Sequence, residues 1–144
     1  MRWQLLNSRL AGQATLELAL SLPLLLVVLL LIVDIGRVVQ AELGVQATAR
    51  EAARTCATAP TEAACLAEGV ERARQVAAGY GLDVQRTEVT LDDGRFARTG
   101  TAVARASYRL GLLGSGRGFG PSLEAEATHA EPIDRYRSRI GVTR

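Results

Sequence analysis

Lysine is absent from this chain of 144 residues, so all 17 of its basic side chains are arginine. This bias indicates a GC-rich coding sequence more readily than a function that requires guanidinium groups. Aromatic residues make up only 4% of the chain, and the apolar side chains are mainly Ala, Val and Leu. A core outside a membrane would therefore consist of small side chains, and we expect such a domain to be only marginally stable by itself.

Residues that carry catalytic or metal chemistry are scarce. The single histidine, His129, has no Ser or Cys nucleophile nearby in a catalytic pattern, so we interpret it as a strand residue. Two cysteines and one distant histidine do not make a four-ligand zinc site. The glycine-rich stretch from Gly114 to Gly120 lacks the Lys-Ser/Thr ending of a phosphate-binding loop and is predicted to be an inter-strand loop. We therefore predict no enzyme activity, no metal and no cofactor.

The charges are unevenly placed along the chain. Arg2 and Arg9 stand in residues 1–12, which contain no acid, whereas 15 arginines and 15 acids balance one another from Gln13 onward. The formal net charge of +2 thus belongs to a short basic leader. No basic patch points to nucleic acid as a partner.

A long apolar run follows the leader. Residues 18–33 carry no charge, and only Ser21 and Pro23 interrupt the aliphatic side chains. Backbone groups in lipid must bond to one another, so this run is predicted to be helical. A helix from Ala14 to Gly36 would rise ~35 Å, enough for a hydrocarbon core of ~30 Å. Pro23 should kink it, and the positive-inside rule places the N-terminus in the cytoplasm.

The pattern beyond Asp34 and Arg37 predicts that this helix continues as an amphipathic stem. Apolar residues recur at spacings of three and four, which indicates one buried stripe: Val38, Ala41, Val45, Ala49, Ala52 and Cys56. Polar residues form another stripe at four-residue spacing: Glu42, Gln46, Arg50 and Arg54. The alternative is an ordinary surface helix.

A turn at residues 58–62 and a second helix from Glu62 to Ala78 are expected next. Thr and Pro favour a helix start there, and Gly79-Tyr80-Gly81 favours a stop. Its predicted apolar face consists of Ala63, Leu66, Ala67, Val70, Ala73 and Ala77.

Three strands are predicted in the last third of the chain. Residues 84–91 run into a turn at Asp92-Asp93-Gly94, and residues 101–110 alternate between an apolar and a polar face. In residues 122–130, Leu123, Ala125 and Ala127 alternate with polar side chains. The predicted fold is α+β: a long N-terminal transmembrane and stem helix, a second helix and a small antiparallel β-sheet.

Glu17 is the most informative single residue. A carboxylate costs roughly 2.5 kcal/mol or more at the centre of a membrane helix and less near its end, so Glu17 needs a partner. Cleavage after Gly12 would free an α-amino group on Gln13, which is positive at neutral pH and would be a suitable partner. A simpler reading of Glu17 is an acid that reaches the membrane boundary by itself.

At these residues the chain resembles the TadE-like pseudopilins of tight-adherence (Tad) pili, which have a type IV pilin-like N-terminus. The likeness extends over about residues 11–56. It consists of Gly12, Gln13, Glu17 and Pro23, the boundary Asp34-Ile35-Gly36-Arg37, and the stretch Ala49-Arg50-Glu51-Ala52-Ala53-Arg54, in which Ala52 stands where the family commonly has Gly.

The resemblance implies a minor pseudopilin that assists assembly of a Tad-type pilus or secretion filament. A prepilin peptidase would cut after Gly12, and Glu17 would be needed for assembly. The implied partners are membrane lipid, that peptidase, other pilins and pseudopilins, and the pilus assembly platform. The implied location is the bacterial inner membrane, with a single pass and with possible incorporation into a pilus.

This topology divides the chain into a leader (1–12), a transmembrane helix (13–36) and an extracytoplasmic stem with a small α+β domain (37–144). It places Cys56 and Cys65 outside the cytoplasm, where a disulfide is permitted and would contribute ~2 to 3 kcal/mol; two free thiols are the alternative. Two other readings stay open for the whole chain: a secreted binding protein released from a signal peptide, and an uncleaved single-pass accessory protein.

Overall fold

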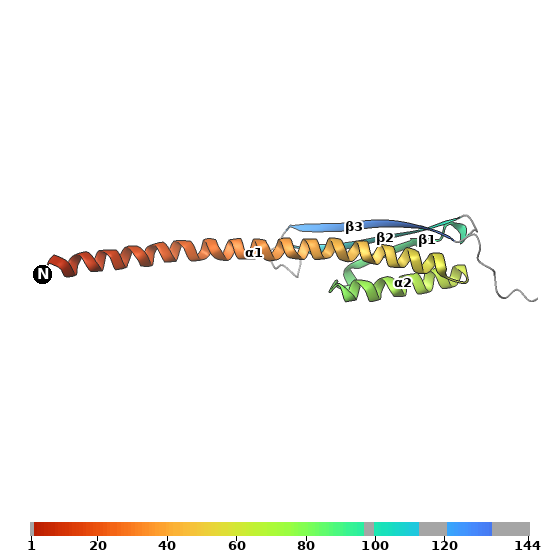
Figure 1. Ribbon diagram of the computed structural model, residues 1–144, viewed down its shortest axis with the longest axis horizontal. Helices are drawn as coiled ribbons and strands as arrows, with labels where there is room; N and C mark the ends of the chain where they lie inside the picture. Colours follow the sequence, from red (N-terminus) through yellow and green to blue (C-terminus); the bar gives the residue numbers. More distant parts are fainter. Residues whose placement is uncertain (1, 97–99, 113–120, 134–144) are drawn as a thin grey trace, which may run out of the picture. The chain divides into compact units, whose positions relative to one another are not determined.

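The chain forms two helices followed by three strands. The computed structural model describes residues 2–96, 100–112 and 121–133, with side chains from Thr15 onward except that of Arg95. The helices are α1 (Arg2–Thr58) and α2 (Glu62–Gly79), and the strands are β1 (Thr87–Asp92), β2 (Thr101–Gly111) and β3 (Ser122–Pro132) (Figure 1). Two short 3₁₀ turns, η1 (Val84–Arg86) and η2 (Gly94–Phe96), flank β1. The α+β prediction is confirmed.

The chain divides into two units, residues 1–36 and residues 37–144, which are described separately. The first unit consists of the N-terminal part of α1. The second contains the rest of α1, α2 and the sheet.

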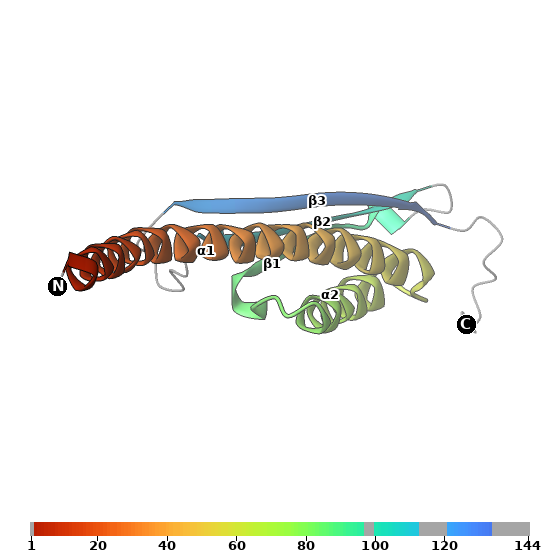
Figure 2. The same cartoon turned by 60° about the vertical axis from the view of Figure 1, so that its left-hand side comes forward.

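In the second unit the end of α1 and α2 form an antiparallel hairpin. Thr61 caps α2, since its Oγ1 accepts a hydrogen bond from the Ala64 N–H at 3.2 Å. The predicted turn and helix start are thus confirmed, and α2 ends one residue beyond the expected position. Figures 1 and 2 both show α2 beside the last part of α1. At the far end of α2, Gln40 Nε2 donates to the Tyr80 carbonyl at 2.8 Å.

Close approach of the two helices depends on glycine. A Cβ added to Gly69 would lie 2.8 Å from Leu91 Cδ1 and 3.3 Å from the Ala52 carbonyl oxygen. The α2 backbone therefore rests almost directly on α1 and on β1. A longer side chain at position 69 would force these elements apart.

The sheet is antiparallel with the order β1-β2-β3. Leu91 is opposite Ala104, and Tyr108 is opposite Ala125. The turn after β1 occurs at the predicted place, where Asp92 Oδ1 accepts from the Gly94 N–H at 3.0 Å and Gly94 adopts a φ of 58° that favours glycine. The strand itself begins three residues later than predicted, because residues 84–86 form η1, capped by the Asp83 carboxylate.

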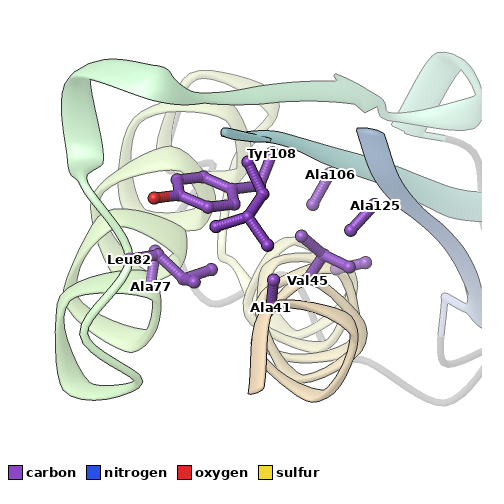
Figure 3. Close-up of a cluster of buried hydrophobic side chains, with 9 residues drawn as sticks. Ala41, Val45, Ala77, Leu82, Ala106, Tyr108 and Ala125 are labelled. Carbon is purple, nitrogen blue, oxygen red and sulfur yellow. The ribbon is translucent and has the colours of Figure 1, made fainter. Parts of the chain in front are cut away.

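The core lies between the helices and one face of the sheet, and it consists mostly of alanine. The predicted stem stripe is confirmed: Val38 is half-buried and the others are buried. The predicted inward face of β2 is also buried throughout, at Ala102, Ala104, Ala106, Tyr108 and Leu110. Figure 3 shows Tyr108 and Leu82 filling the space beside Val45, where alanines alone would leave a gap.

Two predicted faces are partly wrong. On α2 the buried line is Cys65, Gly69, Ala73 and Ala77, whereas Ala63, Leu66 and Ala67 are exposed. The buried face differs from the predicted one because α2 contacts α1 at Cys65, through the disulfide, and at Gly69, beside the Ala52 carbonyl. Apolar periodicity did not select either residue. On β3, Ala125 is buried but Leu123 is 39% exposed, since it stands opposite Leu110 near the end of the β2–β3 ladder.

Candidate functional site at the acidic start of the apolar helix

The residues predicted for processing and assembly all lie on α1. Gly12 and Gln13 belong to the helix, and their side-chain surroundings lie outside the described part of the structure. Glu17 is exposed. Glu17 is four positions after Gln13, a rise of ~6 Å along a helix. A Gln13 amine and the Glu17 carboxylate would therefore be offset by about one turn on any one copy.

Aliphatic side chains surround Glu17 and are not covered by the described residues. Leu16 and Leu18 are each 64% exposed, and large apolar residues as far as Ile35 are similarly uncovered. Leaving such a side chain in water costs on the order of 1 kcal/mol or more. A helix of this kind is stable only where lipid or other apolar helices cover it.

One helix in the described residues, near the N-terminus, is long and apolar enough to cross a membrane by length and composition. None of its most apolar 18-residue window is buried in the structure, in contrast to the core helix of a water-soluble domain.

Within that helix Glu17 forms no ion pair with a described side chain. It is also the only charged residue between Thr15 and Val33. The arrangement leaves one acceptor group, with a negative charge when ionised, on an otherwise apolar surface. A cation supplied by another chain would be a suitable partner.

Pro23 lies inside α1, and the helix continues through it. Proline has no N–H to donate, so the Ala19 carbonyl loses its usual helical partner. Nearby, Ser21 Oγ donates to the Leu18 carbonyl at 3.2 Å. The predicted kink at Pro23 stays a prediction.

In the stretch 49–54 the alanines are buried and the arginines are exposed. Ala49, Ala52 and Ala53 are fully buried. Glu51 pairs with Arg72 of α2, with 3.7 Å between Oε2 and Nε. Arg50 and Arg54 are exposed. The alanines explain why this stretch suits the helix hairpin, whereas packing gives no reason for the two arginines.

Cys56 and Cys65 are joined by a disulfide in the structure, and both are fully buried. The bond links the last turns of α1 to the first turn of α2. Its presence in the cell stays a prediction.

The other residues considered in the sequence add no chemistry to this site. His129 lies on β3 as expected, and its Nε2 is 3.3 Å from Glu131 Oε2. The stretch 114–120 lies outside the described residues. Among the described side chains, no group of three or more His, Cys, Asp or Glu could hold a metal ion.

Sequence reasoning missed Thr48, which is fully buried and donates from Oγ1 to the Gly44 carbonyl at 2.7 Å. Its position three residues after Val45 and four before Ala52 was the available signal, since that spacing places it on the buried stripe.

The comparison with family models supplies the deciding observation. Residues 12–54 match the family described as TadE-like protein. This segment is therefore similar to TadE-like proteins. The match begins at Gly12 and ends at Arg54, so it contains Glu17, Pro23 and the stretch 49–54, and the resemblance drawn from the sequence is confirmed. No curated protein and no solved structure is significantly similar to the chain.

Proposed function

We propose that this protein is a membrane-anchored, minor pseudopilin-like component that acts in assembly of a Tad-type pilus or a related secretion filament. The TadE-like match suggests a role in Tad pilus systems. The observation that carries the finer proposal is Glu17, a lone acid on an uncovered apolar stretch of α1 that lies within the matched segment.

The proposed maturation is cleavage after Gly12 by a prepilin peptidase. Removal of residues 1–12 discards Arg2 and Arg9 and leaves an α-amino group on Gln13. The chain would then stay in the inner membrane through residues 13–36, with residues 37–144 outside the cytoplasm. Extraction from lipid would transfer the aliphatic surface into a bundle of similar helices.

In that bundle the Glu17 carboxylate would pair with the Gln13 amine of a neighbouring subunit. Both charges would leave water, so the pair need not add net stability. A neighbour in the wrong register would leave a buried charge without a partner, which is strongly unfavourable. Glu17 would thereby select one register between subunits.

The first test is the mature N-terminus, measured by mass spectrometry on protein purified from membranes. The proposal predicts Gln13. A retained Met1 would instead support an uncleaved single-pass accessory protein, and a start beyond Gly36 would support a secreted binding protein. Either result would remove the proposed amine.

The second test replaces Glu17 by Gln, which keeps the size of the side chain and removes its charge. Membrane insertion should persist, because the change makes the helix less polar, whereas recovery of assembled filaments should fall sharply. Glu42→Gln on the same helix is the matched control and should assemble normally. Normal assembly of the Glu17→Gln variant would refute the role.

A further inference from the structure

An open groove runs along the outward face of α1 between α2 and the edge strand β3. Its volume is about 1000 Å³. Leu43, Arg50 and Arg54 line it from α1, Tyr80 lines it just beyond the end of α2, and residues 126–129 line it from β3. Its two acids, Glu51 and Glu126, are paired with Arg72 and Arg105. Leu43 is 53% exposed and Tyr80 is 41% exposed. The groove therefore combines apolar surface with basic groups at one end.

Arg50 and Arg54 stand one helical turn apart and point outward. Neither forms an ion pair with a described side chain, although Glu51 between them is paired with Arg72. Side chains four residues apart on a helix lie ~6 Å from each other. Together they present two parallel positive charges that suit two carboxylates at similar spacing.

The same unit carries an acidic pair of this kind on α2. Glu68 and Glu71 are exposed and line a second, smaller hollow of about 370 Å³. Glu71 accepts a hydrogen bond from Gln75 Nε2 at 3.3 Å, and neither acid forms an ion pair within the described residues. They lie three residues apart, which places them on one side of α2.

The basic pair Arg50 and Arg54 and the acidic pair Glu68 and Glu71 lie at the same position along the axis of the helix hairpin, here called the same height. The antiparallel register is given by the Cys56–Cys65 bond, the approach of position 69 to Ala52, and the Glu51–Arg72 ion pair. Continuing this register places Glu68 at the level of Arg54 and Glu71 at the level of Arg50. Two copies placed side by side without an axial shift would therefore align two opposite-charge pairs.

We infer that the groove over Arg50 and Arg54 binds the Glu68–Glu71 face of a second copy of this chain. Charge complementarity at matched height selects this occupant. The parallel orientation rests on the membrane anchoring proposed above, since both copies would share one membrane, but the contact requires neither cleavage after Gly12 nor Glu17. Each copy uses two different surfaces, so the contact is heterologous and leaves one of each free for the next copy.

Carbodiimide cross-linking of the full chain in native membranes tests this contact. The chain has no lysine, so Arg54→Lys introduces a single side-chain amine that a carbodiimide joins only to a carboxylate in direct contact. Cross-linked dimers should appear on denaturing gels above the wild-type background, and mass spectrometry should map the link to Glu68 or Glu71. Arg74→Lys, at an exposed position on α2 that does not line the groove, is the matched control and should give no dimers.

Two further variants identify the partner. Adding Glu68→Gln and Glu71→Gln to Arg54→Lys should abolish the dimers, and co-expression with the wild-type chain should restore mixed dimers by supplying the acids in trans. Absence of Arg54→Lys dimers, dimers that survive loss of both acids, or links only to a different protein would each overturn the inference. Repeating the assay with Glu17→Gln separates it from the proposed function, because the dimers should persist there.

Discussion

The disulfide between α1 and α2 should supply a large part of the stability of residues 37–144. It closes a short loop, since the two cysteines are nine positions apart. In the chain-entropy account, a loop of this size contributes about 2.7 kcal/mol. The alanine-rich core around it gives little area per side chain, so this contribution is a substantial fraction of a typical 5–15 kcal/mol.

The perturbation is the double substitution Cys56→Ala with Cys65→Ala, compared with the wild-type chain before and after reduction. Both sulfurs are fully buried, so the double variant also loses some packing, and the reduced wild-type chain isolates the effect of the bond itself. We expect the free energy of unfolding to fall by about 2.7 kcal/mol when the bond is lost.

The assay is pulse proteolysis across a urea series, with the full chain held in non-ionic detergent. Thiol trapping in denaturant on native membranes reports whether the pair is oxidised in the cell, as the proposed location outside the cytoplasm predicts. Two freely reactive thiols, or a loss below ~0.5 kcal/mol in both the double variant and the reduced chain, would refute the reasoning.

Three other substitutions test the packing with the same proteolysis assay. Gly69→Val should lower the free energy of unfolding by ~1 to 3 kcal/mol because a Cβ there meets Leu91 and the Ala52 carbonyl. Gly79→Val is the control, and with nothing within 4 Å of its Cβ it should change this free energy by less than ~1 kcal/mol. Equal effects of the two substitutions would contradict the close approach of α2 to α1 and β1. Tyr108→Ala should cost ~3 to 5 kcal/mol because Tyr108 is only 8% exposed. Leu66→Ala should cost less than ~1 kcal/mol because Leu66 is 41% exposed. Arg105→Ala should cost less than ~1 kcal/mol although its Nε lies 3.1 Å from Glu126 Oε1, because both side chains are more than half exposed and water screens the pair; a larger loss would show that the outer face of the sheet is not simply solvated.

Local pattern was sufficient for most of the fold. The stem stripe and the inward face of β2 follow from periods of 3.6 and 2, which a single element specifies by itself. The α2 cap at Thr61 and the turn at Gly94 follow equally from local chemistry. These features were predictable because each depends on residues close in sequence.

The errors occur where contact between elements decides the outcome. The spacing of apolar side chains predicted that Leu66 lies on the buried face of α2. The helix instead buries Gly69, which has no side chain and therefore does not contribute to an apolar pattern. Strand β1 starts late because the Asp83 carboxylate favours a 3₁₀ turn before it. For the candidate site, sequence alone predicted Glu17 and the boundary at residues 34–37, whereas the matched heights of two charged pairs required the register of the hairpin.

The two parts of α1 place their apolar residues in opposite ways, and this contrast explains how one helix can serve two environments. From Leu16 to Ile35 the side chains are large and face outward all around the helix, so they need lipid or other helices as a partner. From Ala41 to Ala57 the buried side chains are small and occupy one stripe, which lets α2 and the sheet approach closely. The change falls next to Asp34 and Arg37, where charge returns. The chain's own residues cover α1 only beyond this boundary. In the proposed assembly, other helices can therefore replace lipid around the first part of α1 without unfolding the second part.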